Sequence, residues 1–349
     1  MQNVQVADKL IGPGQPVFVI AEAGVNHNGD LKLARALIDV AVEAGADAVK
    51  FQTFRADRLV TPDAPKAEYQ WQTTGDAESQ FEMLKRLELS VDAHRELQSY
   101  CNERGILFLS TPFDEEAVDL LDELGVPAFK ISSGDLTNSP LLEHVASKGK
   151  PVILSTGMSE LSELIEAVSI LNTAGCESPV LLHCVSNYPA QPAEVNLRAM
   201  QTMRSAFDVP VGFSDHTEGI DVALAAVALG ACVIEKHFTM DRTLPGPDHP
   251  ASLEPAELRE LVRSIRRVES ALGSGRKIPA AGEIETAKVA RRSLVAARDI
   301  PAGATLEREM VVMRRPGTGM SPAMLNTLLD RKATRDLAAG TLLEEDMFE

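Results

Sequence analysis

One repeated pattern constrains the fold of this chain more than any other feature of its sequence. A helical segment ends near a glycine, and a short apolar run rich in β-branched residues follows and finishes in a polar residue. Glycine is favoured just past the end of a helix, and strands that alternate with helices are typical of βαβ units with parallel strands. Eight such runs occur, at residues 17–23, 48–52, 107–111, 128–133, 152–156, 180–186, 211–216 and 233–238.

Eight strand–helix repeats predict a closed (β/α)8 barrel, the TIM barrel, in which about 250 residues form one domain. The alternative is an open, doubly wound parallel sheet. No G-x-G-x-x-G sequence follows the first apolar run, and the count of eight strands also favours the barrel. We therefore predict an α/β barrel over residues 1–272, with a last helix that opens at Pro255.

The character of the chain changes after this last helix. Residues 273–289 begin with glycines and continue with polar residues, which is typical of a linker. From residue 290 onward, short β-like runs at 293–297 and 310–313 alternate with turns that contain proline and glycine. We predict a small, mainly β second domain over residues 290–349.

Two segments of the barrel region fall outside the repeat. Residues 1–9 are predicted to be a short polar lead-in, without the basic start and apolar core of a signal peptide. Residues 53–90 are longer than one helix and its loops require. There we predict a long loop on the rim of the barrel, followed by a helix over residues 78–87, because long loops inside compact domains are usually functional.

Composition argues against some classes of partner and compartment. The formal net charge of −17 argues against nucleic acid or an anionic membrane as a partner, although a few lysines can still create a positive pocket. The four cysteines are scattered without a C-x-x-C pair, as expected of free thiols in a reducing cytoplasm. No uninterrupted apolar run reaches about 18 residues, so no membrane span is expected. We predict a cytoplasmic protein.

The carboxyl ends of the predicted strands carry the residues that suit chemistry. In a parallel barrel the active site lies at these ends, where alternate residues point inward. His216 and His237 end neighbouring strands, so their imidazoles can converge on one point and hold a divalent metal ion. Lys50 and Lys130 stand among apolar residues, where a buried ammonium needs an anionic partner such as a phosphate or carboxylate. Further polar residues turn inward by the same alternation: Glu22, Gln52, Thr111, Ser155, Ser186 and Ser214.

A structural explanation competes with a functional one at each of these positions. A single histidine, lysine or serine at a strand end is more often a structural hydrogen-bonding group than a ligand. Alternation turns His183 and Asp215 outward, so we assign neither to the site, and Asp215 would at most orient His216. Function is favoured because nearly every predicted strand end carries an inward polar group, which a purely structural barrel would replace with apolar side chains.

Nine short motifs, taken together in their order and spacing, resemble the nonulosonic (sialic) acid synthase family. They are EAGVNHNG at 22–29, KFQ at 50–52, STPF at 110–113, KISSGD at 130–135, LSTGM at 154–158, YP at 188–189, GFSDHT at 212–217, EKHFT at 235–239 and GPDH at 246–249. The tail, with RRPGTG at 314–319, resembles the antifreeze-like domain of that family. The resemblance covers essentially the whole chain.

This resemblance implies a (β/α)8 barrel followed by an antifreeze-like (β-clip) domain, and a transferase activity. The family condenses phosphoenolpyruvate with N-acetylmannosamine, or a related N-acetylated amino sugar, and water to give a nine-carbon 2-keto acid and phosphate. An alternative within the family is an N,N'-diacetyllegionaminate synthase that uses 2,4-diacetamido-2,4,6-trideoxy-mannose. The rim sequence at 66–84 is similar to that of such members and less similar to pseudaminate-type synthases.

The resemblance also implies roles for individual residues. A divalent metal ion, Mn²⁺ with Mg²⁺ or Co²⁺ as alternatives, would bind His216 and His237, and Glu22 and Asp135 are candidates for proton transfer. The phosphoenolpyruvate contacts would be Lys50, Thr111, Lys130, Ser133, Ser155, Ser186 and Ser214. The sugar contacts would be Glu22, Gln52, Phe113, Tyr188, Asp248 and, from the antifreeze-like domain of the other subunit, Arg315. This last contact implies a domain-swapped homodimer.

Two other functions compete with this one. A different phosphoenolpyruvate aldol-type synthase would use a phosphorylated sugar, but a second phosphate needs basic residues, and the predicted rim is not rich in them. A non-catalytic carbohydrate-binding protein is the rival from another class. The inward lysines and histidines, together with Glu22, argue against it, and absence of phosphate release would favour it.

Overall fold

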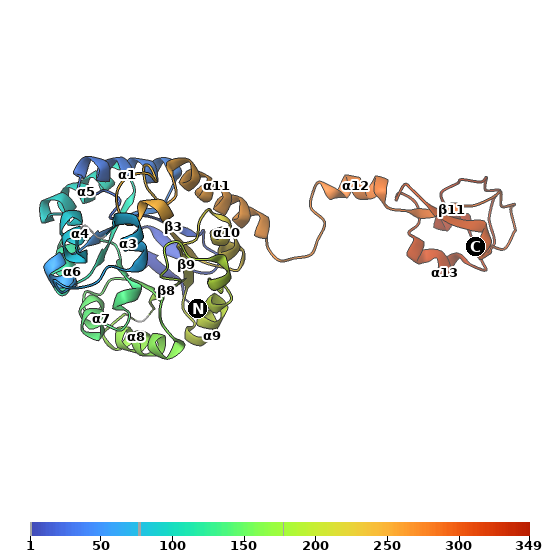
Figure 1. The fold of residues 1–349 in the computed structure, drawn as a ribbon. Helices are drawn as coiled ribbons and strands as arrows, with labels where there is room; N and C mark the ends of the chain where they lie inside the picture. The colour runs from blue at the N-terminus through green and yellow to red at the C-terminus, as the bar shows by residue number, and fades with distance from the viewer. Residues whose placement is uncertain (1, 76–77, 177) are drawn as a thin grey trace. The chain divides into compact units, whose positions relative to one another are not determined.

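The chain divides into two compact units, Met1–Gly273 and Ser274–Glu349. The structure is a computed structural model that describes residues 2–75, 78–176 and 178–349 (Figure 1). The described residues contain no helix long and apolar enough to cross a membrane.

The first unit is built on eight parallel strands in the order β5-β4-β3-β10-β9-β8-β7-β6. Within the described residues β5 and β6 share no backbone ladder, so the barrel is nearly closed, and the predicted (β/α)8 fold is confirmed. The strands are β3 (Phe18–Gly24), β4 (Ala48–Thr53), β5 (Leu107–Pro112), β6 (Phe129–Ile131), β7 (Val152–Ser155), β8 (Val180–Cys184), β9 (Val211–Asp215) and β10 (Val233–His237).

A ring of helices surrounds these strands (Figure 1). Apolar side chains on the outer face of the strands, such as Val19 and Phe213, pack against the inner faces of the helices, as at Leu37 and Leu261. Glycine in the left-handed conformation ends α1 at Gly45, which is the turn that the sequence predicts. The helices of the ring are α1 (Leu31–Ala44), α5 (Val91–Arg104), α6 (Glu115–Glu123), α7 (Ser139–Ala146), α8 (Leu161–Thr173), α9 (Ala199–Phe207), α10 (Asp221–Ala228) and α11 (Pro255–Leu272).

The N-terminal lead-in forms structure that the sequence did not predict. Strands β1 (Val4–Val6) and β2 (Lys9–Ile11) pair as an antiparallel hairpin. Their buried side chains join the inner core of the barrel, together with residues at the starts of the strands such as Phe18 and Val233. The hairpin therefore fills the amino-terminal end of the barrel interior, and polar side chains are left to the opposite end.

The long segment after β4, residues 54–89, is mostly helical and is called the rim segment. It contains α2 (Ala56–Leu59), α3 (Glu68–Thr74) and α4 (Gln80–Leu87). The helix predicted over 78–87 corresponds to α4, which Ser79 and Glu82 cap by reciprocal side-chain-to-backbone hydrogen bonds. We expected loop where α3 occurs.

The second unit is small and has its own core, which includes Leu294, Ile300 and Phe348. Strands β11 (Ser293–Ala296) and β12 (Val311–Arg314) pair antiparallel, and a short helix α13 (Leu325–Leu328) follows. Part of the segment predicted as a linker at 273–289 is helical, because α12 spans Glu283–Ala290.

Candidate active site

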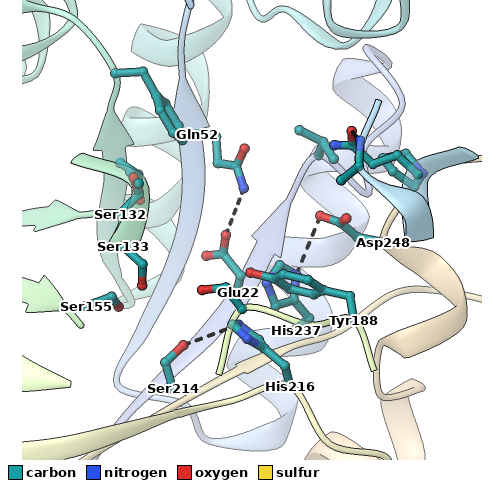
Figure 2. A pocket seen from close by; sticks show the side chains of 18 of the residues that line it. Glu22, Gln52, Ser132, Ser133, Ser155, Tyr188, Ser214, His216, His237 and Asp248 are labelled. Atoms are coloured by element: carbon teal, nitrogen blue, oxygen red, sulfur yellow. Dashed lines mark hydrogen bonds and ion pairs between the residues drawn. The ribbon is translucent and has the colours of Figure 1, made fainter. Parts of the chain in front are cut away.

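A cavity of about 450 Å³ lies at the carboxyl ends of the barrel strands. Side chains from the strand ends and from the rim segment line it together (Figure 2). The described lining contains every site residue selected from the sequence except Asp135 and Arg315. The predicted residues that do line the cavity are Glu22, Lys50, Gln52, Thr111, Phe113, Lys130, Ser133, Ser155, Ser186, Tyr188, Ser214, His216, His237 and Asp248.

His216 and His237 form a pair of imidazoles on one side of the cavity. His216 follows β9 directly and His237 ends β10, so the parallel pairing of these strands places the rings side by side. The ring centroids are 5.5 Å apart, with 60° between the ring planes. Nδ1 of His216 donates to the carbonyl oxygen of Val185 at 2.7 Å. Because a carbonyl only accepts, the proton lies on Nδ1. Nε2 then carries a lone pair, with Ser214 Oγ at 3.5 Å, while the Ser214 hydroxyl donates to Glu235.

This pair fits a divalent metal ion. Burial lowers the pKa of both rings, to about 4 for His216, so both are neutral near pH 7 and able to bind metal. Metal–imidazole bonds are about 2 Å long, so rings at this separation can share one ion. Nδ1 of His237 is buried without a hydrogen bond among the described residues and lies 3.8 Å from Asp248 Oδ2.

The protein would supply few further ligands to such an ion. Across the residues that the structure describes, no group of three or more His, Cys, Asp or Glu side chains is placed to hold a metal. Two imidazoles would therefore be the protein's contribution, and water or substrate oxygens would complete the coordination shell. A partly open shell of this kind is typical of catalytic metal sites.

Two lysines and two carboxylates form a buried charge cluster beside the imidazoles. Lys50 Nζ lies 2.9 Å from Glu22 Oε2 and 3.7 Å from Glu235 Oε2, and Lys130 Nζ lies 3.5 Å from Glu235 Oε1. Thr111 Oγ1 accepts from Lys50 at 2.9 Å. All four charged side chains are buried, so each charge depends on the others for its stability.

The cluster shifts the pKa values of its members in different directions. Burial raises the pKa of Glu22 to about 7, even though Lys50 opposes this shift. Burial also acts to raise the pKa of Glu235, but the positive charges of Lys130 and Lys50 outweigh burial and lower this pKa to about 2. Burial lowers the pKa of Lys130, whereas at Lys50 the two carboxylates overcome burial and raise its pKa. Glu22 is therefore the member whose protonation changes most easily near neutral pH.

Hydroxyl groups surround the two lysines. Ser155 Oγ is buried and has no hydrogen-bond partner within the described part of the chain, so it is available to a ligand. Ser133 Oγ accepts from the backbone N–H of Gly157 at 2.9 Å, and Ser214 Oγ donates to Glu235 at 2.8 Å. Ammonium groups and hydroxyls in one buried place are suited to an anion with several oxygens.

Aromatic and polar side chains continue the cavity from the imidazoles toward the rim. The ring centroid of Tyr188 lies 4.1 Å from that of His216, and the ring centroid of Tyr69 of α3 lies 4.9 Å from that of Tyr188. Gln52 donates to Glu22 Oε1 at 3.4 Å (Figure 2). Burial raises the pKa of Asp248 to about 6.

Two residues selected from the sequence lie elsewhere. Asp135 is absent from the described lining, because the 3-10 turn Ser133–Asp135 directs its carboxylate to Ser132 Oγ, at 2.6 Å, and to Asn138. Its partner Ser132 does line the cavity. Arg315 belongs to the second unit, where it is exposed.

The sequence prediction assigns no site role to Glu235, which pairs with both lysines. Alternation along its strand puts Glu235 on the same face as His237, so the signal was present in the sequence. Tyr69 and Cys184 also line the cavity. Alternation puts Cys184 on the same face as Ser186, whereas Tyr69 carries no comparable signal. Tyr69 belongs to the helix that was not predicted.

The two residues assigned to the outer face have structural partners. His183 stacks on Phe213 and contacts the carbonyl oxygen of Val195 through Nε2. Asp215 is not bonded to His216 in the described structure. It accepts from Lys236 at 2.9 Å and from Thr217, and so pairs strand β9 with β10 behind the imidazoles.

Comparison with known proteins identifies the family. Residues 37–277 match the NeuB family, and residues 291–349 match the SAF domain. The chain is 50% identical over 336 residues to the N,N'-diacetyllegionaminic acid synthase of Legionella pneumophila, covering 95% of this chain and 94% of that protein. It is 43% identical to the human N-acetylneuraminate-9-phosphate synthase, covering 98% and 95% of the two chains.

A solved structure agrees with these relatives. The crystal structure of the N-acetylneuraminic acid (sialic acid) synthetase of Leptospira borgpetersenii in complex with citrate matches with a TM-score of 0.72 and 41% identity. The match covers 82% of this chain and 95% of that one. The chain is therefore an enzyme of the NeuB family, the sialic and legionaminic acid synthases, with a SAF (antifreeze-like) domain at its C-terminus.

Proposed function

We propose that this enzyme condenses phosphoenolpyruvate with an N-acetylated amino sugar and water to give a nine-carbon 2-keto acid and inorganic phosphate. The observation that supports this most directly is a single cavity in which two buried lysines stand beside a pair of neutral imidazoles. The lysines suit the phosphate and carboxylate of phosphoenolpyruvate. The imidazoles suit a metal ion that accepts the carbonyl oxygen of the open-chain sugar.

In this proposal the charge cluster binds phosphoenolpyruvate. Lys50 and Lys130 would neutralise its negative charges, and Ser155 Oγ, which has no partner in the described structure, would donate to it. C3 of phosphoenolpyruvate then attacks the aldehyde carbon of the sugar and forms the new C–C bond. Water adds at C2, and phosphate departs with cleavage of its C–O bond. The remaining contacts would come from Thr111, Ser133, Ser186 and Ser214.

Glu22 is our candidate for proton transfer. A group with a pKa of about 7 can exchange a proton at neutral pH, and Glu22 lies between Lys50 and Gln52 in the cavity. Glu235 is less suited to this role, since the lysines keep it ionised. We now assign Asp135 a positioning role, through the hydrogen bond that it accepts from Ser132.

A divalent cation would be held by His216 and His237. When bound, it would act as a Lewis acid toward the sugar carbonyl oxygen. We propose Mn²⁺ as the metal. Mg²⁺ and Co²⁺ are alternatives, because two nitrogen ligands alone do not select one metal.

The sugar that we propose is 2,4-diacetamido-2,4,6-trideoxy-mannose. The support is the relative that shares half of its residues with this chain across nearly its whole length and is named a diacetyllegionaminic acid synthase. N-acetylmannosamine is the second candidate, and the likeness to a solved N-acetylneuraminic acid synthetase favours it.

A phosphorylated sugar is less suited to this cavity. Its described lining contains no arginine, and its only lysines, Lys50 and Lys130, already pair with Glu22 and Glu235. A second phosphate would therefore compete with phosphoenolpyruvate for the same positive charge. Tyr188, Phe113, Gln52 and Asp248 are our candidates for contacts with the neutral sugar.

We further propose a cytoplasmic homodimer in which the SAF domain of one subunit serves the barrel of the other. Arg315 is exposed in its own unit, which leaves its guanidinium available to a partner. Such an arginine could donate to sugar oxygens at the mouth of the partner's cavity.

The test of the proposed function is a phosphate-release assay. It compares N-acetylmannosamine with 2,4-diacetamido-2,4,6-trideoxy-mannose at fixed phosphoenolpyruvate, with Mn²⁺ and with a chelator. We expect metal-dependent phosphate release and the higher kcat/KM for the diacetamido sugar. Absence of phosphate release with either sugar would contradict the proposal and favour a binding protein.

A further inference from the structure

The rim segment gives the cavity a wall that is more apolar than a fully hydroxylated sugar requires. Met83 and Leu87 of α4 are buried beneath this wall. Leu59, Leu84 and Phe113 pack on them, line the cavity and remain only partly buried. Packing of the rim segment onto the barrel explains the two buried residues. It leaves the apolar surface of the other three uncovered inside a substrate cavity.

Two of the three wall residues come from a different part of the barrel than the reacting groups. The lysines and imidazoles belong to strand ends, whereas Leu59 and Leu84 belong to α2 and α4 of the rim segment, and Phe113 follows β5 directly. Under the proposed function, C1 of the open-chain sugar lies at the imidazole pair. C6 is the carbon farthest from C1, so an extended chain directs its C6 end away from the strand ends and toward the rim.

We infer that Leu59, Leu84 and Phe113 bind the C6 end of the sugar and select a methyl group there over a hydroxymethyl group. This inference rests on the proposed function and adds to it the residues that determine the specificity. A methyl group at C6 would cover the exposed apolar surface and would itself be removed from contact with water. A hydroxyl at the same place would lose its hydration without gaining a partner from these three side chains.

Three polar side chains of the described rim segment line the cavity, those of Tyr69, Gln70 and Gln80, and they bond to one another. Gln80 Nε2 donates to Gln70 Oε1 at 3.2 Å, and Gln70 Oε1 also accepts from the backbone N–H of Ala67. A hydrophobic pocket rejects an added hydroxyl by up to about 100-fold. We therefore expect discrimination at C6 of about 10- to 100-fold in kcat/KM.

The first experiment uses the wild-type enzyme with Mn²⁺ and three sugars. N-acetylmannosamine and its 6-deoxy analogue differ only in the C6 oxygen, and 2,4-diacetamido-2,4,6-trideoxy-mannose is the third. We expect the 6-deoxy analogue to have a kcat/KM at least about tenfold above that of N-acetylmannosamine. Phosphate release from the sugars without discrimination at C6 would overturn this inference and leave the proposed function intact. No phosphate release from any of the three would overturn both.

The second experiment assigns the discrimination to the wall. Leu84→Gln places a polar group in the wall, and it should bring the ratio of kcat/KM values for the two C6 analogues close to one. Leu59→Gln is the second variant and should act in the same direction. The matched control is Leu224→Gln, because Leu224 is a partly buried leucine of α10 outside the cavity lining, and its ratio should match the wild type. If both wall variants retain the wild-type ratio of kcat/KM values, these residues do not determine the selectivity at C6.

Discussion

Replacing Asp215 by asparagine should destabilise the barrel strongly, because it leaves a buried lysine without its anionic partner. Lys236 and Asp215 face one another on β10 and β9, with 2.9 Å between Nζ and Oδ2. Their side chains are 1% and 0% exposed. Lys236 also donates to the carbonyl oxygen of Thr217, while Asp215 Oδ1 accepts from the backbone N–H and hydroxyl of Thr217.

The size of the effect follows from this geometry. Two unit charges 2.9 Å apart attract with about 6 kcal/mol at an effective dielectric constant of about 20. Asparagine removes that attraction but keeps an oxygen that can accept a hydrogen bond. Lys236 can also lose its proton, and burial already lowers its pKa. Breaking a buried pair by removing one partner costs about 3–5 kcal/mol, and we expect Asp215→Asn to fall in this range.

Urea unfolding monitored by circular dichroism, in the presence of a chelator, measures the change. Adding Lys236→Met to Asp215→Asn removes the stranded charge, so the double variant should be more stable than Asp215→Asn alone. The control is Asp119→Asn, since Asp119 pairs with Lys148 on the surface and its loss should change stability little. The reasoning fails if Asp215→Asn costs less than about 1 kcal/mol, or if Lys236→Met restores nothing.

Three further predictions concern the site. His216→Ala and His237→Ala should each abolish phosphate release while the circular dichroism spectrum stays unchanged; activity that survives both substitutions and chelation would remove the metal from the mechanism. A chain truncated after Lys288 should keep a folded barrel but lose most phosphate release, because Arg315 is then missing, and full activity would refute the swapped contact. Burial raises the pKa of Glu22 from 4.5 to about 7, so the folded state binds this proton more tightly than the unfolded state does. The free energy of unfolding of the wild type, relative to that of Glu22→Gln, should therefore decrease as the pH rises from about 4.5 to about 7, as measured by urea unfolding with a chelator. A difference that stays constant over this pH range would contradict the raised pKa.

The barrel was predictable because its signals are local. Glycine-terminated helices and alternating apolar runs give eight strands, and each observed strand lies within a few residues of its predicted range. The strand predicted at 128–133 is shorter than expected, since β6 ends at Ile131 and the chain turns at Ser133–Asp135 to place Ser132 and Ser133 in the cavity. That turn is also the reason that Asp135 lies outside the described lining.

Other elements lacked a local signal. The hairpin of β1 and β2 has only three residues in each strand, and its apolar residues become core only because the barrel interior is open to them. Helix α3 is short, and contacts from outside it, such as the bonds from Lys66 to Thr74 and Gly75, support it. Elements of this length depend on tertiary packing more than on propensity.

The sequence by itself determined the number of barrel strands, the inward face of each of them and thus most of the residues that line the cavity, because these follow from periods of two and of 3.6 residues along the chain. Only the tertiary structure decided which of those residues touch. Lys50, Lys130 and Glu235 are far apart in sequence, and closure of the barrel brings Nζ of each lysine within 4 Å of a carboxylate oxygen of Glu235. The protonation states of these residues depend on this proximity, because burial and charges within a few ångströms set the pKa of a group. A local sequence pattern does not contain that information.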